Sequence, residues 1–194
     1  MSRHVAIVTD STAYLPQRTM ERHGITAVPL TVVLGDRALE EGTEISTRSL
    51  AQALQKRRSV TTSRPSPERF AETYRRLAES GATGIVSLHL SAELSGTHDA
   101  AVLAAREAPV PVRVVDTGMV AMALGFCAVA AAETAEAGGT VDEAVAAAEK
   151  RAAGTSAHFY VDTLDYLRRG GRIGTAQALL GSALAVKPLL QLQD

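Results

Sequence analysis

A stretch of small hydroxyl side chains with one glycine, LSAELSGTH at residues 90–98, lies between an apolar run and an alanine-rich run. At a junction from a strand to a helix, Ser95, Gly96 and Thr97 would offer hydroxyl donors and free backbone N–H groups at the positive end of the helix. Such a junction suits a carboxylate or phosphate oxygen, and Gly96 would let the anion come close. The alternative is that Ser95 merely caps the helix, a position where serine is favoured.

Two further hydroxyl-bearing segments are expected at the same edge of the molecule. One contains Thr62, Ser63 and Arg64, and the other contains Ser11 between Asp10 and Thr12. Three such loops after neighbouring strands would converge on one crevice and could bind an anion there. The alternative is that they are three independent caps.

The segment LRRGGRIG at 167–174 combines arginines with glycines. Arg169 and Arg172, with their neighbour Arg168, supply planar donors suited to carboxylate or phosphate, and the glycines allow unusual backbone angles. No Gly-Lys-Ser/Thr follows, so the segment is not a P-loop, and its glycine spacing is not that of a dinucleotide-binding loop. On its own it is equally typical of solvated arginines beside a turn.

A serine hydrolase and a metal site are weaker alternatives. Ser95, His98 and an aspartate at 99 or 116 are the residue types of a catalytic triad, but the GxSxG elbow is missing and His98 follows Ser95 too closely on the same helix. The histidines have no metal-ligand spacing and are expected to be surface or packed residues: His4, His23, His89, His98 and His158.

Composition limits the class of protein. The 194 residues are 46% hydrophobic and 21% charged, with a net charge of -1, so the chain can bury a core and has no general attraction for nucleic acid. Its only cysteine, Cys127, excludes an intramolecular disulfide, and no signal pattern opens the chain. The most apolar stretch, 119–132, has 14 residues, short of the ~20 that span a bilayer. We therefore expect a cytoplasmic protein.

Strand-like and helix-like segments alternate along the chain. Strands are predicted at 4–9, 25–34, 84–90, 112–116 and 158–164. Helices are predicted at 46–58, 119–137, 140–153 and 175–181, and one more begins at 67. Residues 59–67 are predicted to form a loop. This alternation predicts an α/β fold whose parallel sheet is flanked by helices, with ligands bound beyond the carboxyl ends of the strands. The N-terminal domain is expected over 1–154, and 155–194 would begin a second, truncated α/β domain.

Six motifs in order resemble the DegV family of fatty-acid-binding proteins over essentially the whole chain. They are VTDSTAYLP at 8–16, VPLTVVLGD at 28–36, TTSRPSP at 61–67, SLHLSAELSGT at 87–97, VVDTGMV at 114–120 and LRRGGRIG at 167–174. The resemblance implies a two-domain α/β fold that grips one long-chain fatty acid, with the acyl chain in an apolar tunnel. It further implies a carrier protein that is not an enzyme, needs no cofactor besides its lipid, and presents the carboxyl group to a fatty-acid kinase.

The resemblance also assigns residues. Thr62 and Ser95 match the family's carboxylate contacts, and Arg169 or Arg172 would join the head-group network or dock the kinase. The remaining candidate lipid-site residues are Ser63, Gly96, Thr97 and Ser11.

One departure is that family members continue beyond the position of Asp194, with further strands and a histidine that completes the head-group site. The apolar run 183–193 would then be a strand without a partner, which predicts partial exposure of the tunnel or dimerisation through that edge. We expect a monomer or weak dimer, with transient membrane contact left open. The runner-up function is an enzyme that acts on a small carboxylated or phosphorylated metabolite at the same crevice, and a third class is a pure interaction module.

Overall fold

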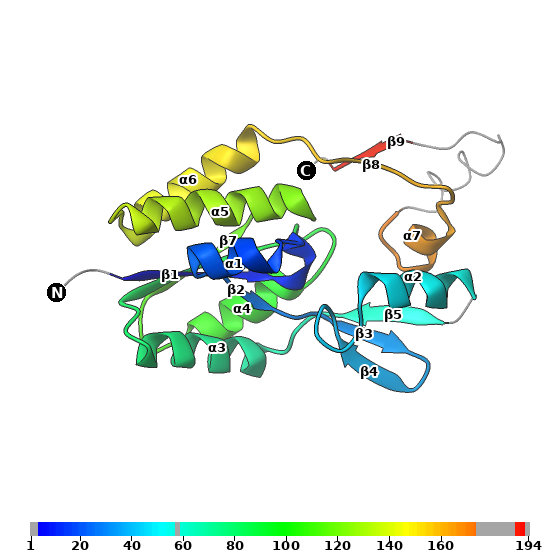
Figure 1. Ribbon diagram of the computed structural model, residues 1–194, viewed down its shortest axis with the longest axis horizontal. Helices are drawn as coiled ribbons and strands as arrows, with labels where there is room; N and C mark the ends of the chain where they lie inside the picture. Colours follow the sequence, from blue (N-terminus) through cyan, green and yellow to red (C-terminus); the bar gives the residue numbers. More distant parts are fainter. Residues whose placement is uncertain (1–3, 57–58, 174–188, 193–194) are drawn as a thin grey trace. The chain divides into compact units, whose positions relative to one another are not determined.

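The computed structural model describes residues 4–56, 59–173 and 189–192 of the chain (Figure 1). The chain divides into two compact units, Met1–Thr155 and Ser156–Asp194. The first unit holds a parallel sheet and a small antiparallel sheet, and the second holds a two-stranded sheet.

A four-stranded parallel sheet in the order β2-β1-β6-β7 forms the centre of the first unit. Its strands are β1 (Val5–Asp10), β2 (Thr26–Val28), β6 (Gly84–His89) and β7 (Val112–Asp116). Every residue of β1 and β6 is buried, as expected of central strands that helices cover on both faces. The strands predicted at 4–9, 84–90 and 112–116 are thus confirmed.

Helices cover both faces of this sheet (Figure 1). One face carries α1 (Gln17–His23), α5 (Met122–Glu136) and α6 (Val141–Ala153), and the other carries α3 (Pro67–Glu79) and α4 (Thr97–Ala105). Alternate strand residues face the two cores, so Ile7 packs on the side of α5 and Val8 on the side of α3. The prediction of an α/β fold with a helix-flanked parallel sheet is confirmed.

Side-chain caps form at two helix starts that the sequence marks with a capping residue, and a third such residue forms none. The Thr140 hydroxyl accepts from the Glu143 N–H at 3.2 Å, and the Glu143 carboxylate accepts from the Thr140 N–H at 2.7 Å, so a capping box begins α6. The Ser46 hydroxyl accepts from the Ser49 N–H at 3.2 Å and so caps α2 (Thr47–Gln55). Ser66 occupies the N-cap position of α3, but its hydroxyl forms no capping hydrogen bond.

A small antiparallel sheet corrects two sequence-based expectations. Its strands, in the order β4-β3-β5, are β3 (Thr31–Leu34), β4 (Arg37–Glu40) and β5 (Val60–Ser63). The segment 25–34 therefore forms two strands in two different sheets, with Pro29 between them. After Pro29, the Leu30 N–H donates to the Ser11 hydroxyl at 3.0 Å and not to a neighbouring strand. Residues 60–63 are a strand rather than part of a loop, because Thr61 and Thr62 pair with Val33 and Val32.

The second unit contains β8 (His158–Tyr160), α7 (Asp165–Arg169) and β9 (Leu189–Gln191). Strands β8 and β9 pair antiparallel, with Phe159 opposite Leu190. The expectation that the apolar run 183–193 lacks a strand partner is therefore wrong for residues 189–191. Its remaining part up to residue 188, and the predicted helix at 175–181, lie outside the described residues.

Candidate functional site

Hydrogen bonds join the loops at the carboxyl edge of the parallel sheet to one another. The Ser91 N–H, just after β6, donates to the Met119 carbonyl after β7 at 2.9 Å. The Thr117 hydroxyl donates to the His89 carbonyl at 2.8 Å. The Leu90 N–H donates to the Asp10 carboxylate at the end of β1, at 3.1 Å. The segment that leads to Ser95 thus starts from a fixed platform.

A buried chain of hydrogen bonds leads from α3 to the carboxyl ends of β6 and β1. The Tyr74 hydroxyl of α3 donates to the Ser87 hydroxyl at 2.9 Å, and Ser87 lies 2.8 Å from Nε2 of His89. Nδ1 of His89 is 3.0 Å from the Asp10 carboxylate. All four residues are fully buried, and burial raises the pKa of Tyr74 to about 12, so this hydroxyl stays a donor at neutral pH.

The order Asp10, His89, Ser87 is that of a catalytic triad, but its serine has no access to a substrate. Ser87 is completely buried and already bonded on both sides. Sequence reasoning missed this network and treated His89 as one of several scattered histidines. The available signal was the spacing of Ser87 and His89, which places two polar side chains on the same face of a buried strand.

The triad considered around Ser95 does not form. The Ser95 hydroxyl lies 2.9 Å from the Thr97 hydroxyl, whereas Nδ1 of His98 lies 3.5 Å from the Asp99 carboxylate. Asp116 accepts from backbone N–H groups at 3.0 and 3.1 Å. The Ser95 side chain is therefore not activated by a neighbouring base in this structure.

Ser95 also does not cap α4. The N-cap residue is Gly96, and within the described part of the chain no side chain forms a capping hydrogen bond there. The first turn of α4 thus keeps backbone N–H groups that an anion can bind. Thr97 is buried, and Ser95 and Gly96 are half-buried.

Thr62 and Ser63 lie at the exposed end of β5, opposite Val32 and Thr31. The next residue, Arg64, reaches the start of α4: a Cβ placed on Gly96 would lie 3.2 Å from Cδ and 3.3 Å from Cζ of Arg64. The structure therefore brings the end of β5 and the loop containing Ser95 together, at opposite ends of one arginine side chain.

Ser11 has other partners. Its hydroxyl donates to the Glu41 carboxylate at 2.6 Å and accepts from the Leu30 N–H at 3.0 Å. Tyr14 donates to the same carboxylate at 3.0 Å, and burial together with the Glu41 charge raises the Tyr14 pKa to about 12. Ser11, Tyr14 and Glu41 line a groove of about 730 Å³ that Thr26 and Thr47 also border. Both hydrogen-bonding roles of Ser11 are thus used within the protein.

Arg169 and Arg172 belong to the second unit and are exposed. Arg169 ends α7, and the Arg172 guanidinium donates to the Gly170 carbonyl. Their neighbour Arg168 lies 3.7 Å from the Asp165 carboxylate. The predicted role of Arg169 or Arg172 at a lipid head group stays a prediction.

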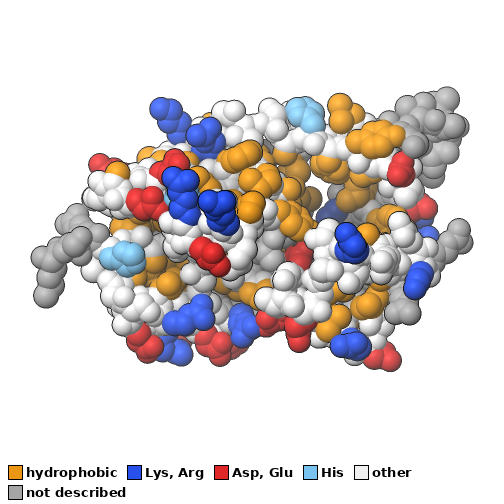
Figure 2. Space-filling model, viewed as in Figure 1, with side chains coloured by type: hydrophobic (Ala, Val, Ile, Leu, Met, Phe, Trp, Pro, Cys, Tyr) orange, Lys and Arg blue, Asp and Glu red, His pale blue; other side chains and the backbone are white. Residues whose placement is uncertain are grey.

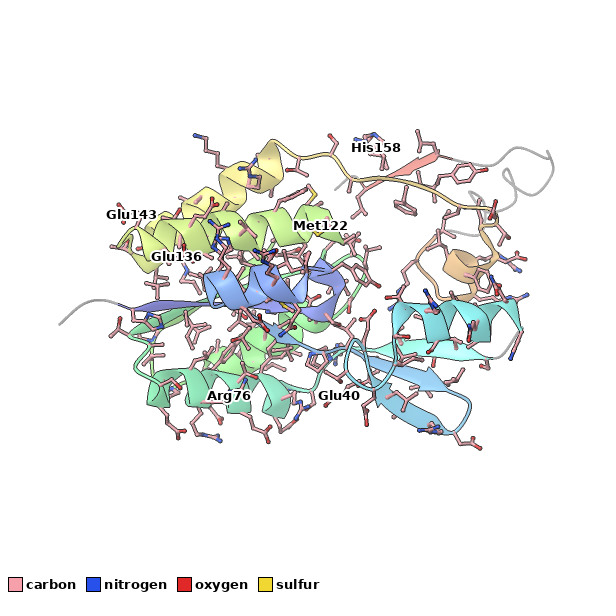
Figure 3. The ribbon with its side chains drawn as sticks, viewed as in Figure 1. Glu40, Arg76, Met122, Glu136, Glu143 and His158 are labelled. Carbon is pink, nitrogen blue, oxygen red and sulfur yellow. The ribbon has the colours of Figure 1, made fainter. Side chains whose placement is uncertain are left out.

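A strained backbone residue and a buried hydroxyl without a partner among the described residues were not predicted from the sequence. Ala121, directly before α5, has φ 57° and ψ −146°, a conformation that alanine adopts only under strain. Met122 begins α5 next to it (Figure 3). The Thr9 hydroxyl near the end of β1 is buried without a hydrogen-bond partner in the described part of the chain. Such costs are typical of functional sites.

Other kinds of site find little support in the ranges 4–56, 59–173 and 189–192. These residues contain no group of three side chains placed to hold a metal ion. None of their helices is long and apolar enough to cross a membrane. Figure 2 shows basic and acidic side chains interspersed over α1 and α3 on the visible face.

Comparison with known proteins identifies close relatives. A family model described as "Uncharacterised protein, DegV family" matches residues 4–194. A DegV domain-containing protein of Streptomyces coelicolor is 92% identical over 193 residues, which cover 100% of this chain and 69% of that protein.

Two solved structures have the same fold. A DegV family protein from Thermus thermophilus, described by its fatty acid binding, is 41% identical with a TM-score of 0.88, over 98% of this chain and 68% of that one. DegV from Bacillus subtilis, described as a fatty acid binding protein, is 34% identical with a TM-score of 0.89, over 100% of this chain and 69% of that one. The chain thus spans about two thirds of the length of these relatives.

Proposed function

Because the chain belongs to the DegV family, we propose that it binds a long-chain fatty acid and holds the carboxylate between Thr62 and Ser95. Fatty-acid binding by the similar proteins of Thermus thermophilus and Bacillus subtilis supports this proposal. The single observation that carries the choice of residues is the contact of Arg64 with Gly96, which joins the end of β5 to the start of α4.

The chemistry of this junction suits a carboxylate. Hydroxyl groups and the unpaired N–H groups of the first turn of α4 are donors, and a carboxylate removed from water needs such donors to offset its lost hydration. The acyl chain supplies most of the affinity, at about 0.8 kcal/mol for each buried methylene. The hydroxyls would therefore fix the position of the head group more than the strength of binding.

The wider function follows from the same proposal. The acyl chain lies in an apolar tunnel, and residues 155–194 begin the domain that covers it. The protein acts as a carrier that presents the carboxyl group to a fatty-acid kinase, with Arg169 or Arg172 in the head-group network or the kinase contact.

A second candidate is an enzyme for a small carboxylated or phosphorylated metabolite. The uncapped first turn of α4 favours it, since that turn would bind any small anion equally well. Extraction of the purified protein with organic solvent, followed by mass spectrometry of the extract, separates the two. A carrier retains a fatty acid from its expression host, whereas a metabolite enzyme yields none.

The residue assignment is tested by Ser95→Ala with palmitate as the ligand. We expect binding to weaken by about 1.5–3 kcal/mol, the range for a hydrogen bond to a charged group. Thr61→Val is the matched control, because Thr61 is an exposed neighbour of Thr62 on β5. An unchanged dissociation constant for Ser95→Ala in isothermal titration calorimetry would contradict the assignment.

A further inference from the structure

The cationic side chain of Arg64 lies against the start of α4. It directly follows β5, is exposed, and its guanidinium packs on Gly96. Among the described residues, no hydrogen bond or ion pair of this guanidinium is formed with an acidic side chain. Asp99, in the first turn of α4, has its carboxylate beside His98 instead.

This placement puts the Arg64 guanidinium beside the positive end of a helix. The N-terminus of a helix carries roughly half a positive charge, and Asp99 in the first turn of α4 offsets part of it. A guanidinium packed against that end adds a second positive charge. An anion between Arg64 and the first turn would be attracted by both groups.

The hydroxyls of Thr62 and Ser95 cannot by themselves recognise charge. A hydroxyl both donates and accepts, so it can bind a carboxylate, an ester or an alcohol. A guanidinium only donates and is always charged. Selection of a charged head group over a neutral one is therefore favoured by groups that only donate, such as the Arg64 guanidinium and the N–H groups of the first turn of α4.

We propose that Arg64 recognises the negative charge of the lipid head group and makes the site selective for ionised fatty acids over uncharged lipids of the same chain length. This inference rests on the proposed function. Thr62 and Ser95 position the head group, and Arg64 with the first turn of α4 determines which charge it must have.

The test is a competition between palmitic acid and hexadecanol, measured by native mass spectrometry of the protein incubated with equal amounts of both. The variants are Arg64→Gln, which keeps a polar side chain without the charge, and the control Arg76→Gln. Arg76 is an exposed arginine of α3 (Figure 3). For the unchanged protein and for Arg76→Gln, we expect the acid to be bound in preference to the alcohol.

Arg64→Gln should lower this preference about tenfold, near the weak end of the range for charged hydrogen bonds because the side chain is exposed. Hexadecanol binding should change less than about twofold, which also shows that the variant is folded. An unchanged ratio for Arg64→Gln, or equal binding of acid and alcohol by the unchanged protein, overturns the inference alone. Binding of neither lipid by the unchanged protein overturns the proposed function and the inference with it.

Discussion

Replacement of Asp10 by asparagine tests how much the buried hydrogen-bond network stabilises the folded protein. The Asp10 carboxylate accepts from Thr12, through its N–H at 3.0 Å and its hydroxyl at 2.5 Å, from the Leu90 N–H at 3.1 Å, and from His89 at 3.0 Å. Asparagine has a single acceptor oxygen, which can keep the two contacts with Thr12. Its NH2 group then faces the Leu90 N–H, and two donors meet with no acceptor between them.

The cost follows from burial. An unpaired buried N–H costs about 1–3 kcal/mol, and a hydrogen bond accepted by a carboxylate such as that of Asp10 is worth about 1.5–3 kcal/mol. These two losses overlap only in part, so we expect Asp10→Asn to lower the free energy of unfolding by about 3–5 kcal/mol in total. At roughly 2–4 °C for each kcal/mol, the melting temperature should fall by about 6–20 °C.

Urea unfolding followed by circular dichroism measures this change. Asp116→Asn is the matched control, because Asp116 ends β7 as Asp10 ends β1 but is exposed. The control should cost less than about 1 kcal/mol. The reasoning is refuted if the free energy of unfolding of Asp10→Asn lies within 1 kcal/mol of that of the unchanged protein, which is the result expected for the control.

Two further predictions concern the packing around the same platform. Tyr74→Phe should lower the free energy of unfolding by about 1 kcal/mol at pH 7, because it removes the hydrogen bond to Ser87. Burial raises the Tyr74 pKa from 10.0 to about 12, so stability that is present below pH 10 is lost as the pH rises to 12. Urea unfolding at a series of pH values should show this alkaline loss, about 2–3 kcal/mol, in the unchanged protein and not in the variant. Gly125→Ala should lower the free energy of unfolding by about 1–3 kcal/mol, because the new Cβ would lie 2.8 Å from the carbonyl oxygen of Ala13. Gly154→Ala is the control and should cost less than about 0.5 kcal/mol, because its nearest neighbour is 3.6 Å away. Equal effects in thermal unfolding would contradict the packing of α5 on the segment after β1.

Local patterns in the sequence were enough to predict most of the first unit. Apolar runs closed by a polar residue predict β1, β6 and β7, and Thr140 with Glu143 predicts the start of α6, because these signals act within a few residues. The strand at 60–63 was missed because Thr62 gains its partner, Val32, only from a distant part of the chain.

The candidate site was predictable in its residue types and less so in its contacts. The hydroxyl loops were evident from Ser95 and Thr62, but Ser95 is not a helix cap and Ser11 is bound to Glu41. The contact between Arg64 and Gly96, like the bond between His89 and Asp10, depends on how distant segments pack. No pattern within a short stretch encodes such pairs.

A crystal structure of the protein with bound palmitate tests the central claim most directly. The measured quantities are the distances from the two carboxylate oxygens to the hydroxyl oxygens of Thr62 and Ser95. We predict about 2.5–3.0 Å for both, the usual range of an O–H···O hydrogen bond. A head group bound elsewhere, with both hydroxyls more than about 4 Å from it, would contradict the account.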